Sequence, residues 1–145
     1  MFDAPEGYAT RVRASFAKQI ITRSMGIEMV DVAPGRVTLG MDFNAGFVQQ
    51  HGFHHAGVTA TCLDSACGYA AMTLMPADAE VLTAEFKVNL MAPAQGARFH
   101  FTGTVIKPGR TLMFCEGRAE NELGKLIATM SATMAVVRDR PGVTA

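Results

Sequence analysis

A single aspartate, Asp64, lies within a stretch of otherwise apolar or small residues that runs from Ala56 to Met75. If this stretch is helical, the carboxylate shares one face with small residues at spacings of three and four, namely Gly57, Ala60, Thr61, Cys67, Gly68 and Ala71. A carboxylate with small neighbours leaves room for a bound molecule, on which it could act as a general base or a nucleophile. The alternative is structural, because Asp64 could simply pair with a buried donor in a tightly packed core.

Three histidines, His51, His54 and His55, come just before this stretch. Spacings of three and four can bring imidazole nitrogens to one metal ion when the residues are helical. These residues precede the predicted helix, and no carboxylate or cysteine at ligand spacing completes a set. We therefore expect no metal site, and we interpret the histidines as residues that pack and form hydrogen bonds where the chain enters the helix.

The elements that must position Asp64 follow from the spacing of apolar residues. Helical spacing predicts an amphipathic surface helix over Arg11 to Met25, and a stretch that is apolar all round predicts a buried helix over Ala56 to Met75. Alternating apolar residues predict the strands Ile27 to Val32, Arg36 to Phe43, Val81 to Met91, Ala97 to Lys107, Thr111 to Glu120 and Leu126 to Arg138.

Each predicted strand has one apolar face. In the strand over Val81 to Met91, one face carries Leu82, Ala84, Phe86, Val88 and Leu90, and the other carries Thr83, Glu85, Lys87 and Asn89. Long consecutive strands joined by short turns predict an antiparallel sheet, which would wrap the buried helix. We expect an α+β hotdog fold, with a sheet of about six strands around one long central helix and an additional N-terminal helix. Residues 1–145 are then a single domain with its core over about residues 12–138.

Composition excludes several classes of protein. The 145 residues are 49% hydrophobic and 18% charged, which is typical of one compact globular domain. Thirteen basic residues balance thirteen acidic ones, so no overall positive field would gather nucleic acid or an anionic membrane surface. Asp64 in the middle of the apolar stretch argues against a transmembrane helix.

The cysteines and the N-terminal residues indicate the cellular compartment of the protein. Cys62, Cys67 and Cys115 are odd in number, and the first two would not face each other on one helix. We interpret them as reduced thiols of a cytoplasmic protein. The chain begins without the basic residues and apolar run of a signal peptide, so we do not expect secretion.

Four segments together resemble a known family, namely His55-Ala56-Gly57, Asp64-Ser65-Ala66, Val81-Leu82-Thr83 and Met91-Ala92-Pro93-Ala94. Over about residues 12–138 the chain resembles the PaaI-like acyl-CoA thioesterases of the hotdog superfamily. The resemblance implies hydrolysis of an acyl-CoA thioester to a free acid and coenzyme A, with no cofactor beyond the coenzyme A of the substrate. It permits medium-chain, long-chain or aryl acyl groups.

The resemblance also implies roles for individual residues. In that family a backbone N–H at the start of the central helix polarises the thioester carbonyl, and this position is Ala56, where glycine is usual. The family's acidic residue, a general base or nucleophile, matches Asp64. The amide that places the carbonyl or the water matches Gln49, in place of the usual asparagine, and the hydroxyl that holds the water matches Thr83.

Binding of the substrate and its coenzyme A is assigned to residues beside Ala56 and in a predicted hairpin, namely His55, Gly57, Lys107, Gly109, Arg110 and Thr111. The hairpin supplies two cations, a sharp turn and a hydroxyl, and its counterpart in the family contacts the pantetheine and the phosphates. Without the resemblance, the same segment would be interpreted as an ordinary solvated Pro-Gly hairpin.

Helix geometry limits how these residues could act together. Ala56 and Asp64 are eight residues apart, so a rise of about 1.5 Å per residue separates them by roughly 12 Å. They cannot both reach one thioester carbon from the same chain. If both act in one reaction, they come from different subunits, so the mechanism requires a homodimer, and we expect two dimers to pair into a homotetramer.

Two alternatives remain open. A hotdog hydratase acting on enoyl-CoA uses an aspartate and a histidine close together, but no histidine follows Asp64 before His100. A non-catalytic acyl-CoA sensor would usually carry a DNA-binding appendage, which the short N-terminal segment and the zero net charge disfavour. An acidic residue at position 64 favours an enzyme over a sensor.

Overall fold

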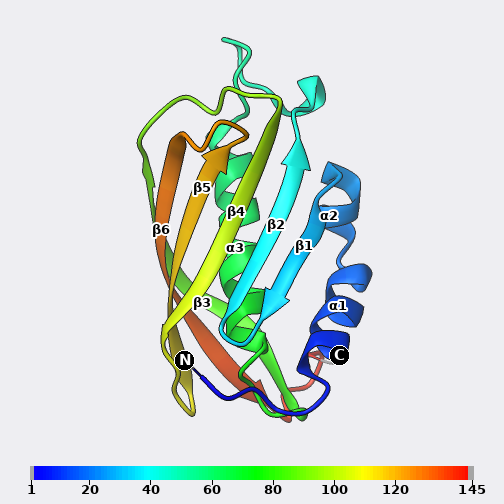
Figure 1. Cartoon of the computed structure of the whole chain (residues 1–145). Helices are drawn as coiled ribbons and strands as arrows, with labels where there is room; N and C mark the ends of the chain where they lie inside the picture. Colours follow the sequence, from blue (N-terminus) through cyan, green and yellow to red (C-terminus); the bar gives the residue numbers. More distant parts are fainter. Residues whose placement is uncertain (1, 144–145) are drawn as a thin grey trace.

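The computed structural model describes residues 2–143, and Figure 1 shows a sheet that curves around one long helix, α3. The helices are α1 (Tyr8–Lys18), α2 (Ile20–Met25) and α3 (Ala56–Met72), with a short 3-10 helix at Ala45–Phe47. The strands are β1 (Glu28–Ala33), β2 (Arg36–Asp42), β3 (Ala79–Leu90), β4 (Arg98–Lys107), β5 (Leu112–Asn121) and β6 (Leu126–Arg138). They lie in the order β1-β2-β4-β5-β6-β3, and all neighbours are antiparallel. The predicted α+β hotdog fold is confirmed.

α3 is buried because it has almost no polar side chain to present to water. Strands β2, β3, β4, β5 and β6 all contact it. The closest approach is at Gly103 of β4, where an added Cβ would lie 2.4 Å from the backbone of Ala66. The absence of a side chain at Gly103 therefore sets how deeply α3, and Asp64 with it, sits in the curve of the sheet. Among residues 2–143, no helix is long and apolar enough to cross a membrane.

The N-terminal segment forms two helices, in contrast to the one helix predicted over Arg11 to Met25. The break is at Gln19, whose backbone is extended (φ −74°, ψ 116°). Its N–H donates to the Phe16 carbonyl (3.0 Å), and its carbonyl accepts from the Thr22 hydroxyl (3.0 Å). Apolar residues keep helical spacing on both sides of Gln19, so periodicity alone does not reveal the break.

α3 ends at Met72, three residues before the predicted end at Met75. The Thr73 hydroxyl turns back and donates to the Ala70 carbonyl (2.6 Å), which competes with continuation of the helix. The Arg11 guanidinium donates to the Met72 carbonyl (2.9 Å) and to carbonyls just beyond it. A cation is favourable at a helix C-terminus, so this contact holds α1 against the end of α3.

Strand β3 departs from the predicted alternation. Its pairing with β6 shifts between Thr83 and Glu85, which marks a β-bulge at Ala84. Thr83 therefore lies opposite the buried Met134 and faces α3, although the alternation placed it on the polar face. Leu82 moves the other way and is 38% exposed. The predicted faces of Thr83 and Leu82 were wrong because one extra residue inverts the period of two.

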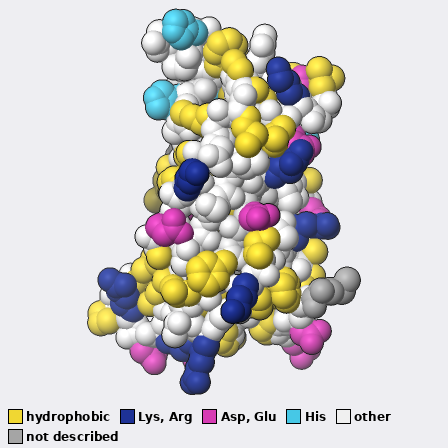
Figure 2. Space-filling view, turned by 90° about the vertical axis from the view of Figure 1, so that its left-hand side faces the viewer, with side chains coloured by type: hydrophobic (Ala, Val, Ile, Leu, Met, Phe, Trp, Pro, Cys, Tyr) yellow, Lys and Arg dark blue, Asp and Glu magenta, His cyan; other side chains and the backbone are white. Residues whose placement is uncertain are grey.

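The remaining apolar face of β3 is less buried than predicted, because β3 is an edge strand that pairs only with β6. Phe86 is 43% exposed and Leu90 is 54% exposed. Figure 2 shows the side that lies to the left in Figure 1, where hydrophobic side chains gather in the lower half and again near the top. Hydrophobic side chains are thus left uncovered on a single chain.

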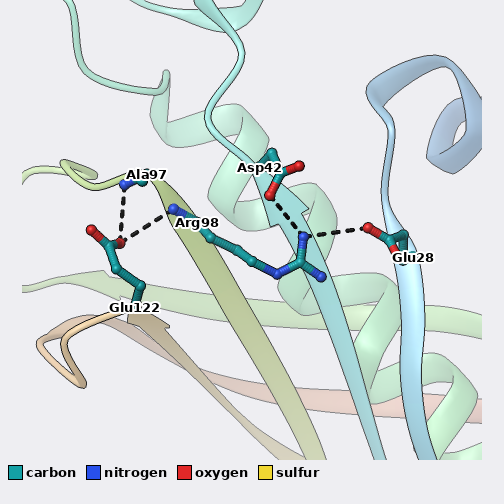
Figure 3. Close-up of polar contacts among 5 residues, drawn as sticks. All are labelled: Glu28, Asp42, Ala97, Arg98 and Glu122. Carbon is teal, nitrogen blue, oxygen red and sulfur yellow. Dashed lines mark hydrogen bonds and ion pairs between the residues drawn. The ribbon is translucent and has the colours of Figure 1, made fainter.

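A polar cluster fixes the end of the sheet nearest the start of α3 (Figure 3). Arg98 donates to Asp42 (2.8 Å) and to Glu28 (3.3 Å), which ties β4 to β2 and β1. Glu122 accepts the backbone N–H groups of Ala97 (3.0 Å) and Arg98 (3.2 Å). These N–H donors, Ala97 first, lower the pKa of Glu122. The carboxylate thus holds the turn before β4 in its ionised form.

We predict that Gly103→Ala lowers the free energy of unfolding by about 1–3 kcal/mol, because the new methyl group would press on the α3 backbone. Urea denaturation followed by circular dichroism measures the change. Gly68→Ala is the matched control, since nothing lies within 4 Å of a Cβ added there and alanine favours a helix over glycine by up to about 1 kcal/mol. An unchanged unfolding midpoint for Gly103→Ala would contradict the close approach.

Candidate active site

Asp64 is half-buried in the middle of α3, and one hydrogen bond orients its carboxylate. The Thr83 hydroxyl donates to Asp64 Oδ1 at 2.7 Å. This contact exists because the bulge at Ala84 turns Thr83 towards the helix. The two residues lie at the edge of a cavity of about 320 Å³, which α1, α3 and β3 line. The arrangement leaves the second carboxylate oxygen available to accept a proton.

Ala56 is the first residue of α3, and its backbone N–H is left free. The preceding His55 caps the helix, and its Nδ1 accepts the N–H of Gly57 at 2.8 Å. Among residues 2–143, the N–H of Ala56 has no hydrogen-bond acceptor. An unpaired N–H at a helix N-terminus attracts an anionic or polarised oxygen. His55 therefore leaves Ala56 as the free donor at this end of the helix, and Gly57 is already occupied.

Gln49 lines the same cavity as His55 and Ala56, which measures about 590 Å³. Its Oε1 accepts two backbone N–H groups, from His51 (2.7 Å) and Phe53 (3.2 Å), and so holds the loop 49–53 in a tight turn. Its Nε2 makes no hydrogen bond to any residue that the structure describes. With the oxygen held in this way, the amide nitrogen is the part of Gln49 that a bound molecule could use.

The predicted residues thus form two clusters. Gln49, His55 and Ala56 line one cavity, and Asp64 and Thr83 line another, with no lining residue in common. Helix rise over eight residues separates Ala56 from Asp64 by about 12 Å. One chain carries two half-sites, each with part of the predicted chemistry.

The histidines before α3 hold the loop together. His54 is buried, its Nε2 accepts the Asn44 N–H (3.0 Å), and its ring lies against Phe43 and Phe99 with centroids 5.0 Å apart in each pair. Burial lowers the pKa of His54, so the ring is neutral and can accept this hydrogen bond. Within residues 2–143, no group of three or more histidine, cysteine or acidic side chains is placed to hold a metal ion.

The predicted coenzyme A hairpin lies away from both half-sites of its own chain. Lys107, Gly109, Arg110 and Thr111 are exposed at the end of the sheet opposite the start of α3 (Figure 1), and they line neither of the two cavities. The turn is tight, since a Cβ on Gly109 would lie 2.1 Å from the Leu112 carbonyl oxygen. The structure therefore does not bring these residues to Asp64 or Ala56 within one chain.

Four residues beside Asp64 were not predicted from the sequence, namely Ser15 of α1, Gln19 between α1 and α2, and Ser65 and Tyr69 of α3. Their sequence signal is weak, because polar residues in an amphipathic helix are usually solvated.

The cysteines are buried and free, and burial raises the pKa of both Cys62 and Cys115 to about 12. They remain thiols at ordinary pH and do not serve as nucleophiles.

Comparison with known proteins identifies the family to which this fold and these two half-sites belong. A family model of the Thioesterase superfamily matches residues 51–128, a span that includes His55, Ala56, Asp64 and Thr83. The chain belongs to the thioesterase superfamily, and it is a thioester hydrolase. The expected membership of the hotdog-fold thioesterases is confirmed.

The sequences of individual relatives align with most of the chain. Human acyl-coenzyme A thioesterase 13 is 32% identical over 104 residues, which is 70% of this chain and 74% of that protein. The 1,4-dihydroxy-2-naphthoyl-CoA hydrolase of Listeria monocytogenes is 25% identical over 120 residues, 83% of this chain and 98% of that protein.

Solved structures agree with the fold. A thioesterase family protein from Silicibacter pomeroyi superimposes with a TM-score of 0.88 and 49% identity, covering 91% of this chain and 99% of that one. PaaI from Escherichia coli gives a TM-score of 0.85 at 15% identity, covering 93% of this chain and 96% of that one. The second likeness shows the shared fold alone.

We predict that Thr83→Val lowers the rate of thioester hydrolysis about 10- to 100-fold, which corresponds to the loss of a hydrogen bond to a charged group worth about 1.5–3 kcal/mol. Valine keeps the shape of threonine but cannot donate to Asp64. Steady-state kinetics measure the effect, and Thr83→Ser, which keeps the hydroxyl, should retain most of the activity. Full activity of Thr83→Val would show that the contact plays no part in the reaction.

Proposed function

We propose that this protein hydrolyses an acyl-CoA thioester to a free acid and coenzyme A, with Asp64 as the acidic catalytic residue. The observation that carries the proposal is the contact between Asp64 and the Thr83 hydroxyl (2.7 Å), which a bulge in an otherwise regular strand provides. A bulge at such a point is typical of strands that aim a side chain at an active site. The acyl-CoA thioesterase and acyl-CoA hydrolase among the relatives support a coenzyme A substrate.

In the proposed reaction, one half-site binds the thioester oxygen and the other supplies the acidic residue. The Ala56 N–H and the Gln49 amide nitrogen donate to the thioester oxygen and stabilise the negative charge that develops on it. Asp64 takes a proton from water as that water attacks the carbonyl carbon, or attacks the carbon itself as a nucleophile. The C–S bond then breaks, and the sulfur of coenzyme A leaves as a thiolate that takes up a proton. Where Asp64 is the nucleophile, an acyl-aspartate anhydride is left, and water hydrolyses it to the free acid and the carboxylate of Asp64. Thr83 acts beside Asp64 by orienting its carboxylate.

The hydratase alternative finds no support in the cavity that holds Asp64. Its described lining residues on the same chain include no histidine. The two histidines that line the Ala56 cavity each accept a backbone hydrogen bond, His54 through Nε2 and His55 through Nδ1. An acid–base pair of aspartate and histidine would need both groups on the reacting atoms. Hydrolysis requires only the carboxylate and water at this place.

The hairpin 107–111 is proposed to bind the phosphates of coenzyme A. Lys107 and Arg110 are exposed and form no ion pair with any residue between 2 and 143. Two unpaired cations on a sharp turn suit an anionic group that arrives from solution. Since the hairpin is distant from both half-sites of its own chain, we infer that it serves a site that a second subunit helps to form.

We further propose that two chains pair along β3 and thereby join their half-sites. β3 is a long unpaired edge with exposed Phe86 and Leu90, and such an edge is normally covered by another strand. Residues 80–83, at the start of β3, line the Asp64 cavity, and residue 90 at its end lines the Ala56 cavity. Antiparallel pairing of two copies would set the start of one β3 beside the end of the other. Each Asp64 cavity would then face the partner's Ala56 cavity, twice per dimer.

Asp64→Asn should lower kcat at least about 100-fold and leave acyl-CoA binding within a few-fold, because asparagine keeps the size of the side chain but cannot accept the proton. Release of free thiol from a panel of acyl-CoAs measures kcat, and isothermal titration measures binding. Asp3→Asn, the same substitution at an exposed residue that lines neither cavity, is the matched control for the loss of one negative charge. Near-wild-type turnover of Asp64→Asn would overturn the assignment of Asp64.

Shared sites predict complementation between two damaged chains. Asp64→Asn and Gln49→Ala homodimers should each be impaired at both sites, whereas a mixed dimer contains one site with both lesions and one intact site. Random pairing after co-refolding equal amounts makes about half of the dimers mixed, so activity should rise to about a quarter of the wild-type value. Native mass spectrometry confirms that mixed dimers form. If they form and the activity equals the average of the two parents, the shared site is refuted.

A further inference from the structure

The cavity beside Asp64 carries polar groups that the proposed reaction leaves unused. Its volume of about 320 Å³ lies near the lower limit of roughly 300–1,000 Å³ for small-molecule sites. Building on the proposed thioesterase function, we propose that this cavity holds the acyl group, and that Gln19 and Tyr69 select compact, uncharged acyl groups that carry a hydrogen-bonding oxygen.

Gln19 presents an amide nitrogen to this cavity from a fixed position. Its backbone is held at the break between α1 and α2, and its Oε1 accepts a hydrogen bond from the Ser65 hydroxyl (3.3 Å). The amide nitrogen makes no hydrogen bond to any residue in the described part of the chain. A side chain anchored through its oxygen is pre-organised to donate through its nitrogen.

Tyr69 supplies a second donor deeper along α3. The residue is 6% exposed, and its ring meets Phe16 of α1 edge to face, with centroids 5.6 Å apart. Burial, the largest cause, raises the pKa of Tyr69 against a hydrogen bond with Ser15 that lowers it, so the phenol keeps its proton. Ser15 lines the same wall. The groups contributed by α1 and α3 are thus suited to an oxygen atom on the acyl group.

The charges around the cavity exclude an anionic acyl group. Asp64 and Glu80 both line it, and no lysine or arginine appears among its described lining residues. A second carboxylate on the acyl group would meet two like charges without a cation to offset them. A neutral hydroxyl or carbonyl oxygen meets donors without that repulsion.

Helix geometry sets the reach from the reacting carbon to these donors. Asp64 and Tyr69 are five residues apart on α3, which is about 7.5 Å of helix rise. An extended six-carbon acyl chain advances about 1.25 Å per bond, so its five carbon–carbon bonds span about 6.3 Å and an oxygen on the last carbon lies about 7.5 Å from the carbonyl carbon. Gly68 lies between them, and nothing occurs within 4 Å of a Cβ added there, so the wall of the cavity is open at this point.

The test compares three coenzyme A thioesters of equal chain length that differ only at the far carbon: hexanoyl-CoA, 6-hydroxyhexanoyl-CoA and adipoyl-CoA. We expect kcat/KM to be about 10-fold higher for the hydroxylated chain than for hexanoyl-CoA, as one added hydrogen bond allows, and lowest for adipoyl-CoA. In Gln19→Leu the ratio of the hydroxylated to the plain chain should fall, and in Gln19→Leu combined with Tyr69→Phe it should fall to about one. Lys18→Ala, an exposed neighbour outside the cavity, is the matched control and should keep the wild-type ratio.

A second variant tests the place of the acyl group without touching its polar partners. Gly68→Leu should lower kcat/KM for the six-carbon substrates at least about 10-fold more than for acetyl-CoA, because the leucine would occupy space that only the longer chains need. Circular dichroism confirms that each variant is folded. Should Gln19→Leu fail to fold, Gly68→Leu and the wild-type substrate series still decide the question.

The outcomes separate this inference from the function on which it rests. If the wild-type protein hydrolyses none of the acyl-CoAs, acetyl-CoA included, the thioesterase proposal itself fails. If it hydrolyses them but does not prefer 6-hydroxyhexanoyl-CoA, or if Gly68→Leu affects acetyl-CoA and the six-carbon chains equally, the acyl pocket lies elsewhere and the inference is overturned. A hydroxyl preference that folded Gln19→Leu retains would remove Gln19 from the selection.

Discussion

The rigidity of α3 is the constraint on which the site depends. The N–H of Ala56 is fixed by the helix start, and Asp64 is fixed eight residues later, about 12 Å along the same rod. Rotation of one short side chain does not close that gap. If the two half-sites act in one reaction, as we propose, they need a second chain, and we propose that it pairs along the edge strand β3, which contributes residues to both cavities.

Three local irregularities turn this regular scaffold into a site. The bulge at Ala84 turns Thr83 onto Asp64, the tight loop held by Gln49 leaves an amide nitrogen facing the Ala56 cavity, and the break at Gln19 brings a second amide to Ser65. In each case a regular element would have pointed the side chain elsewhere or left it in solvent. The regular elements make the scaffold rigid, and the irregular positions set where the side chains point. Bulges near active sites often re-aim a side chain in this way.

The fold was largely predictable from the sequence, and the fine geometry of the site was not. Periodicity located every strand to within about two residues, because an apolar face every second residue is a strong local signal. The bulge at Ala84 and the break at Gln19 depend on hydrogen bonds to distant or neighbouring backbone groups that carry no periodic signature. Asp64 was found by type and spacing and Ala56 through the family resemblance, whereas Ser15, Gln19 and Tyr69 were missed because only the folded chain brings α1 against α3.

At two positions that depart from the family pattern, the proposed chemistry depends on different physical features. At Ala56 the proposed donor is the backbone, and the residue is already helical, so a methyl side chain on an exposed first turn adds no strain. At Gln49 the extra methylene relative to asparagine lengthens the reach of the amide, whose oxygen then closes the loop through His51 and Phe53 while its nitrogen stays free. The loop and the donor are therefore one structure, and a change that loosens the turn would also misplace the nitrogen. In the proposed reaction, the position of the amide nitrogen therefore depends on the oxygen contacts of Gln49, which take no direct part in the chemistry.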